Sequence, residues 1–93
     1  MAKRKQKYHV VFAPAALRQL RKLPTRDQKR IVRETESLED DPRPPGVKKL
    51  AGEDNLWRIR IGDYRVVYEI KDAKLLVLVL RIAHRKDIYR KGK

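Results

Sequence analysis

Three stretches in the second half of the chain have the patterns of β-strands, because two alternate between hydrophobic and polar positions and the third is almost continuously apolar. They cover residues 56–62, 64–70 and 75–83, and the last is apolar on both faces, as expected of a central strand. Gly62-Asp63 and residues 71–74 are short links rich in turn-forming and polar residues. We therefore expect an antiparallel hairpin at each link.

The first half of the chain changes from a strand-like segment to the period of a helix. A first helix is predicted over 13–23, and Pro24 ends it. Thr25 and Gln28 then have the spacing of a capping box, which predicts a second helix through about Glu39. The apolar stripes of the two helices consist of Ala16, Leu17, Leu20 and Leu23 in the first and Ile31, Val32, Thr35 and Leu38 in the second.

The order of these elements predicts an α+β fold. A short N-terminal strand at 7–12 is followed by a helical hairpin and then by a three-strand antiparallel meander, with both helices packed on one face of an antiparallel sheet. At this length we expect a single domain over 1–93, with residues 1–6 as a flexible basic arm. No apolar run approaches the roughly 20 residues that cross a bilayer, and no signal peptide is expected.

Alternation also sorts the strand residues onto two faces of the sheet. The apolar face, which the helices must cover, carries Trp57, Ile59, Ile61, Tyr64, Val66, Tyr68 and Ile70. The opposite face then presents Arg58, Arg60 and Arg65. Strict alternation puts Arg81 in phase with Val77 and Val79, so its membership of that opposite face stays open. The same alternation aims His84 at the helices.

The net positive charge of the chain suggests that the face with these arginines binds a polyanion. The chain has 25 Lys and Arg against 12 Asp and Glu, a formal net charge of +13, which favours a polyanionic partner and nucleic acid first. Arginine suits this role because its planar fork binds phosphate oxygens in pairs. The alternative is that Arg58, Arg60 and Arg65 are simply the solvated side of a sheet, and composition alone leaves the two interpretations about even.

The composition also argues against several kinds of functional site. The chain has no cysteine, so disulfides and thiolate catalysis are excluded, and this usage fits a reducing, cytoplasmic location. The two histidines lie far apart in the sequence, so a transition-metal site is not expected. No Gly-rich phosphate loop and no G-x-S-x-G motif occurs.

The segments LWRIRIGDYRVVYEI, LLVLVLRIAHRKDIYR and KKLAG together resemble the RelE/ParE toxin superfamily, and its RelE branch most closely, over about residues 8–90. This resemblance implies a type II toxin that acts as a ribosome-dependent endoribonuclease and inhibits translation. Such a toxin cleaves mRNA in the ribosomal A site through attack of the ribose 2′-OH, without metal or cofactor. The implied partners are a RelB-type antitoxin in a hetero-oligomer, the ribosome with its 16S rRNA, and mRNA, with no membrane involved.

The resemblance also assigns residues. Its catalytic positions fall on Arg58, Arg60, Arg65, Arg85 and Tyr89, and the RNA-binding positions that we expect are Arg81, Lys48, Lys49, Lys86 and Arg90. Arg65 and Arg85 would hold the scissile phosphate, Tyr89 would stack on or orient the base and 2′-OH, and Arg58 or Arg60 would assist proton transfer.

One position departs from the family pattern. The best-known RelE toxins have lysines where this chain has Arg58 and Arg60, and an arginine scarcely gives up its proton. This departure disfavours a general-base role for either residue and makes His84 an additional candidate. Two alternatives stay open, namely a ParE-like toxin that inhibits DNA gyrase without cutting RNA, and a non-toxic RNA-binding module.

Overall fold

The structure is a computed structural model, and it describes residues 7–50, 52 and 55–86 of the chain. The predicted arm at 1–6, as well as Tyr89 and Arg90, lie outside the described residues. The helices are α1 (Pro14–Arg21) and α2 (Thr25–Glu36), and the strands are β1 (His9–Phe12), β2 (Lys48–Lys49), β3 (Leu56–Ile61), β4 (Tyr64–Lys71) and β5 (Leu76–His84). Short 3₁₀ turns cover Ser37–Glu39 and Asp72–Lys74.

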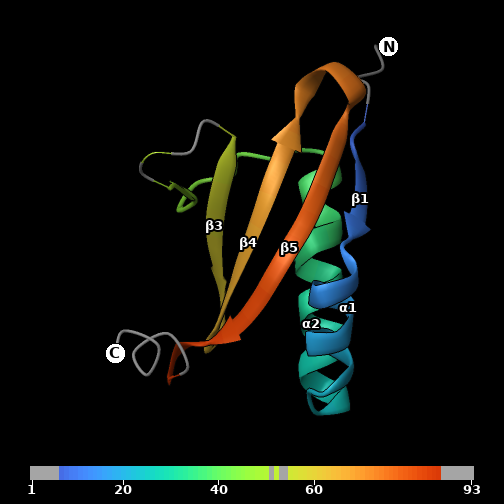
Figure 1. Cartoon of the computed structure of the whole chain (residues 1–93), viewed down its shortest axis with the longest axis vertical. Coiled ribbons are helices and arrows are strands. Elements are labelled where there is room, and N and C mark those ends of the chain that lie inside the picture. The colour runs from blue at the N-terminus through green and yellow to red at the C-terminus, as the bar shows by residue number, and fades with distance from the viewer. Residues whose placement is uncertain (1–6, 51, 53–54, 87–93) are drawn as a thin grey trace.

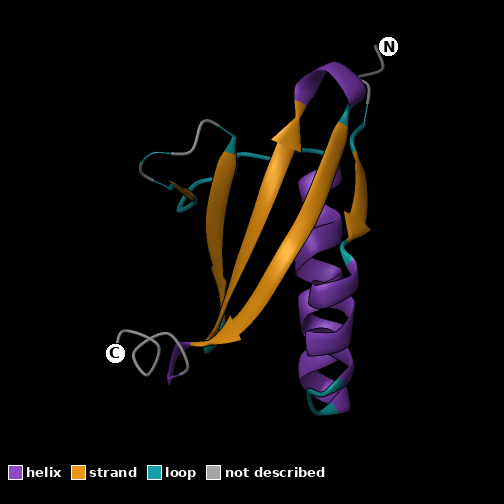
Figure 2. Ribbon diagram, in the orientation of Figure 1, coloured by secondary structure: helices purple, strands orange, loops and turns teal. Residues whose placement is uncertain are grey.

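These elements form two layers. Figure 1 shows α1 and α2 together on one side of the sheet, with β5 crossing between β1 and β4. Figure 2 shows that strands make up one layer and helices the other. The predicted α+β fold is confirmed, with the helical hairpin on one face of the sheet. Within the described ranges, neither helix is long and apolar enough to cross a membrane.

The sheet has the strand order β1-β5-β4-β3-β2. We predicted a wholly antiparallel sheet, but the observed sheet is mixed. β3, β4 and β5 form the predicted antiparallel meander, whereas β1 pairs in parallel with β5. The reason is that two antiparallel helices return the chain to the end of the sheet from which β1 started. β3 therefore runs in the direction of β1, and two hairpin reversals later β5 does so too.

The start of the second helix differs from the predicted capping box. Thr25 is the first helical residue, Pro24 occupies the N-cap position, and no side chain caps this end. Gln28 instead donates from Nε2 to the carbonyl oxygen of Leu23 at 2.8 Å, so that it closes the link that follows α1. The α-helix ends at Glu36, and the last predicted turn is 3₁₀.

The core lies between the helices and the predicted apolar face of the sheet. It consists of Ala16, Leu20, Ile31, Leu38, Ile61, Val66, Tyr68, Ile70, Val77, Val79 and Ile82. Tyr68 is fully buried, and its hydroxyl donates to the carbonyl oxygen of Pro42 at 2.7 Å. Burial raises the pKa of Tyr68 well above the ordinary tyrosine value. This bond ties the loop after α2 to the middle of the sheet.

A β-bulge decides which way Arg81 points. Val67 pairs with Arg81 while its neighbour Tyr68 pairs with Val79, so Leu80 is an extra residue in β5. The bulge shifts the alternation by one residue, which keeps Val79 in the core and puts Arg81 on the side away from the helices. The strict alternation that would align Arg81 with Val79 is therefore wrong.

Candidate nucleic-acid interface

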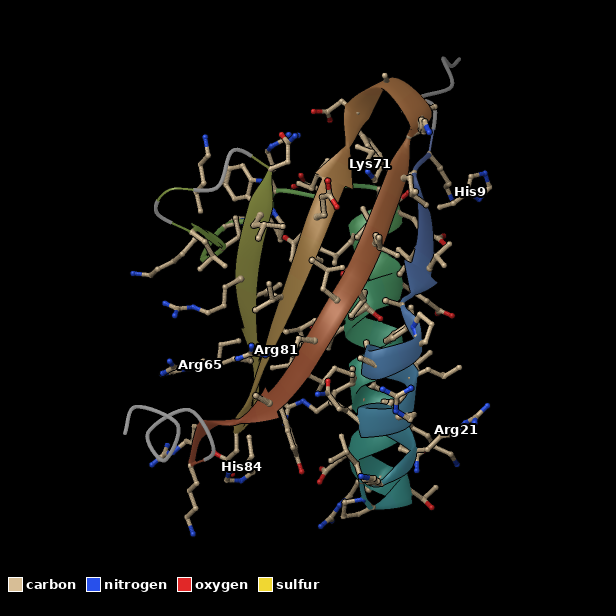
Figure 3. The ribbon with its side chains drawn as sticks, viewed as in Figure 1. His9, Arg21, Arg65, Lys71, Arg81 and His84 are labelled. Atoms are coloured by element: carbon tan, nitrogen blue, oxygen red, sulfur yellow. The ribbon has the colours of Figure 1, made fainter. Side chains whose placement is uncertain are left out.

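Cations line up on the side of the sheet away from the helices. Lys48 lies opposite Arg58, Arg58 opposite Val67, and Val67 opposite Arg81, so one row across β2, β3, β4 and β5 carries three cations. Because directly opposite residues in a sheet share a face, these side chains project from the same side. Figure 3 shows Arg65 and Arg81 on this side, while Arg21 projects from the helical layer.

The next row of the same face adds Arg60 opposite Arg65. We call Lys48, Arg58, Arg60, Arg65 and Arg81 the arginine face. Four of them, all except Arg81, line a hollow of about 300 Å³ together with Gly46. The placement of Arg58, Arg60 and Arg65 on this side agrees with the alternation, and their roles stay predictions.

The positive charges of the arginine face repel one another when no anion is bound there. Like charges directly opposite each other in a sheet repel, and the Lys48–Arg58 and Arg60–Arg65 pairs are of this kind. Among the residues that the structure describes, no member of the arginine face forms an ion pair. Bound phosphate groups would relieve this repulsion and receive several charge-assisted hydrogen bonds at once.

Arg85 lies beyond the hollow, at the end of the same sheet. It follows Ala83, the partner of Arg65, by two residues. Its backbone N–H donates to the carbonyl oxygen of Asp63 at 2.8 Å, and its guanidinium lies 3.9 Å from Asp63 Oδ1. Both side chains of this ion pair are mostly exposed, so the contact is weak enough for an incoming phosphate to compete with Asp63.

Two predicted residues lie elsewhere in the structure. Lys49 points to the helix side, because it lies opposite Trp57, and its Nζ is 6.0 Å from the centroid of that ring. His84 also faces the helices, as predicted, with its ring 5.2 Å from Tyr64 in an edge-on arrangement. His84 is therefore on the wrong side of the sheet to accept a proton within the arginine face. Lys86 is exposed just after β5, and its backbone N–H donates to His84 Nδ1.

A second hollow, of about 410 Å³, lies on the helix side near His84 and the Gly62-Asp63 turn. Tyr64 donates from Oη to Asp27 Oδ2 at 3.0 Å there, and burial together with this bond raises the pKa of Tyr64. Asp27 and Arg30 both line this hollow from α2. Sequence reasoning did not single them out, because only the packing of α2 against the turn brings them to the sheet.

An anchor at the other end of the sheet positions the loop that leads to Lys48. Arg43 contacts Asp72 through its two terminal guanidinium nitrogens, at 2.9 and 3.3 Å, and Tyr8 donates to the same carboxylate at 2.6 Å. The bonds from Arg43 and from Tyr8 hold the pKa of Asp72 below its ordinary range. Arg43 also lies 5.2 Å from the Trp57 ring. The sequence offered one signal for this anchor, a single arginine within the stiff DDPRPPG loop.

Metal ligands do not gather in the described part of the chain. No three histidine, cysteine or carboxylate side chains there come close enough together to hold an ion. The charged groups that the structure brings together are instead the guanidinium groups and one ammonium of the arginine face.

Known proteins are similar to this chain in sequence and in fold. A family model described as the ParE toxin of the type II toxin–antitoxin system parDE matches residues 10–89. Toxin RelG of Mycobacterium tuberculosis is 38% identical over 88 residues, covering 90% of this chain and 98% of that protein. A putative toxin RelE1 of Methanocaldococcus jannaschii is 29% identical over 87 residues, covering 90% of this chain and 97% of that protein.

Solved structures of toxin–antitoxin complexes also contain chains with a similar fold. The toxin–antitoxin complex RelBE2 of Mycobacterium tuberculosis contains a chain that matches with a TM-score of 0.78 and 32% identity, over 90% of this chain and 98% of that one. The archaeal RelE–RelB complex of Pyrococcus horikoshii OT3 gives a TM-score of 0.75 and 30% identity, over 84% and 94% of the two chains. The chain therefore belongs to the RelE/ParE superfamily of type II toxin–antitoxin toxins.

Proposed function

We propose that this RelE-like toxin is a ribosome-dependent endoribonuclease that cuts mRNA in the ribosomal A site and so stops translation. The observation that carries the proposal is the arginine face, where cations from four strands point to one side and those from β2, β3 and β4 line a hollow. Repulsion among these cations makes the hollow a binding site for a phosphodiester, since RNA brings negative charge to it.

The reaction is an intramolecular transesterification. The ribose 2′-oxygen attacks the adjacent phosphorus, the bond from phosphorus to the 5′-oxygen breaks, and the products are a 2′,3′-cyclic phosphate and a free 5′-hydroxyl. Negative charge grows on the phosphoryl oxygens and on the leaving 5′-oxygen as the transition state forms. Guanidinium groups held in place before the reaction stabilise that charge, which is the largest contribution that such a site can make.

Each proposed residue has a part in this step. Arg65 and Arg85 hold the scissile phosphate, and Arg58 and Arg60 fix the neighbouring backbone in line for attack. Arg81 extends the contact along the RNA strand. Tyr89 keeps its predicted role of stacking on the base or orienting the 2′-OH, and Lys86 and Arg90 their predicted contacts with RNA phosphates.

A RelB-type antitoxin is the proposed partner. The solved relatives include RelE–RelB complexes from an archaeon and from Escherichia coli. The strong positive charge of this chain supports an acidic partner that assembles with it as a hetero-oligomer and keeps the toxin inactive. Because the ribosome and the antitoxin would meet the toxin in the same compartment, we expect both interactions in the cytoplasm.

A gyrase-inhibiting activity is the competing function, since the matching family model is named for ParE. The relatives named above include RelE and RelG toxins, which favours the nuclease. The two functions predict different products. A nuclease leaves cut mRNA on ribosomes, whereas a gyrase inhibitor leaves mRNA intact and traps gyrase on DNA.

The test is a cell-free translation reaction in which the mRNA is mapped by primer extension after the toxin is added. Wild type should produce cuts within codons only when ribosomes are present, and Arg65→Ala should weaken them by about 10²-fold or more because it removes charge at the phosphate. Arg21→Ala is the matched control, since it removes one exposed guanidinium from the helical layer (Figure 3). Intact mRNA with wild-type toxin would contradict the proposal.

A further inference from the structure

The proposed transesterification needs a group that can deliver a proton to the leaving oxygen. When the bond to the 5′-oxygen breaks, an alkoxide would form unless that oxygen is protonated as it leaves. Positive charge alone lowers the energy of the alkoxide, but a positioned proton donor typically adds about 10²–10⁴-fold in rate. Arginine is poorly suited to this step because its guanidinium keeps its proton.

Lys48 differs from the other cations around the hollow. The charged side chains that line it are Lys48, Arg58, Arg60 and Arg65, so three of the four are arginines and one is a lysine. Lysine carries its charge as an ammonium whose proton can be transferred, and lysines therefore serve in acid–base catalysis where arginines do not. His84, the nearby residue with a transferable ring proton, faces the opposite side of the sheet.

Backbone pairing determines that Lys48, and not its neighbour, faces the hollow. In the two-residue strand β2, Lys48 lies opposite Arg58 and Lys49 opposite Trp57, so the two ammonium groups project from opposite sides of the sheet. The loop before β2 is tied down by the Arg43–Asp72 contact and by the bond from Tyr68 to Pro42. These contacts hold β2 at the rim of the hollow, next to the arginines that would bind the phosphate.

From this arrangement we infer that Lys48 is the proton donor to the leaving 5′-oxygen. As the 2′-oxygen bonds to phosphorus and the bond from phosphorus to the 5′-oxygen breaks, the Lys48 ammonium gives one proton to the 5′-oxygen. The 2′-hydroxyl proton passes to water, and the neutral amine of Lys48 takes up a proton from water to complete the cycle. This inference rests on the proposed nuclease function and assigns to one residue a step that the arginines cannot perform.

The test compares Lys48→Arg with wild type under single-turnover conditions, with saturating toxin on ribosomes programmed with a defined mRNA. Lys48→Arg keeps the positive charge and loses the transferable proton, so cleavage should slow by about 10²-fold or more while ribosome binding is retained. Lys29→Arg makes the same chemical change at an exposed position on α2, in the helical layer, and should cut at the wild-type rate. Matched circular dichroism spectra of the full-length proteins verify that each variant folds.

A second mRNA isolates the proton transfer itself. In it, sulfur replaces the 5′-oxygen at the cleaved linkage, and a thiolate leaves without protonation because thiols are far more acidic than alcohols. Lys48→Arg should cut this RNA within a few-fold of wild type. Equal rates for Lys48→Arg and wild type on ordinary RNA would overturn the inference and leave the nuclease function standing. A defect of equal size on both RNAs would also overturn it, since Lys48 would then only hold the substrate. A wild-type protein that cuts neither RNA would overturn the proposed function and this inference together.

Discussion

The hydroxyl group of Tyr68 offers a direct test of how the sheet holds the loop before β2. The side chain is 0% exposed, and its single hydrogen bond runs from Oη to the carbonyl oxygen of Pro42 at 2.7 Å. Tyr68→Phe keeps the ring and its packing but removes this bond. The carbonyl group of Pro42, a buried residue, then loses its partner in a place that water does not reach easily.

The size of the effect follows from that burial. A typical hydrogen bond contributes about 0.5–1.5 kcal/mol net, but leaving a buried acceptor unpaired costs about 1–3 kcal/mol. We therefore expect the free energy of unfolding to fall by about 1–3 kcal/mol. For a domain of this size, each kcal/mol lowers the melting temperature by about 4–8 °C, so the fall should be at least a few degrees.

Urea unfolding of the full chain, followed by circular dichroism, measures this change. The midpoint should fall while the slope of free energy against urea stays constant, because the surface exposed on unfolding is unchanged. Tyr8→Phe is the control, since its hydroxyl donates to Asp72 in an exposed setting, where one bond contributes little. Equal losses for the two variants would refute the reasoning that the buried bond to Pro42 anchors the loop.

Two further predictions concern stability. The pKa values of three tyrosines are raised in the folded state, chiefly by burial for Tyr68 and Tyr64 and by the bond to Asp72 for Tyr8. Their stabilising effect is therefore complete below about pH 10, the ordinary tyrosine pKa, and is lost as the pH rises through the raised values. Urea unfolding in steps from pH 8 to 11 should show this loss above about pH 10, with a shallower slope in Tyr68→Phe, and a flat wild-type profile would contradict it. Gly62→Ala should cost about 1–2 kcal/mol, because Gly62 has φ +60 and an added Cβ would lie 3.0 Å from a guanidinium nitrogen of Arg30. An unchanged urea midpoint in that variant would show that the turn does not need glycine.

Local patterns in the sequence were sufficient for most elements and for one face of the site. Period-two alternation predicts β3 and β4 closely, because a strand with one buried face must alternate. It therefore also places Arg58, Arg60 and Arg65 together. The same reasoning failed for Arg81, since the bulge at Leu80 arises from pairing between two strands and leaves no local mark in the sequence.

Contacts between distant segments account for the other differences. The parallel pairing of β1 with β5 depends on how the whole chain reverses direction, and β2 is too short to show any alternation. The Arg43–Asp72 contact joins residues 29 positions apart, so the DDPRPPG loop could point to Arg43 but not to its partner. For the same reason Lys48 and Lys49 look equivalent in the sequence, and only the pairing of β2 with β3 separates them.

The proposed function requires that RNA is cut on the arginine face and not along the cationic side chains of the helices. The most direct measurement is the single-turnover cleavage rate, at saturating toxin on programmed ribosomes, of two double variants that each remove two guanidinium groups. Arg58→Ala with Arg65→Ala empties the hollow, whereas Arg26→Ala with Arg33→Ala removes the same charge from exposed positions on α2. We predict a loss of at least about 10²-fold for the first pair and a rate within a few-fold of wild type for the second. Equal losses in the two would contradict the claim, because net charge and not the face would then govern cleavage.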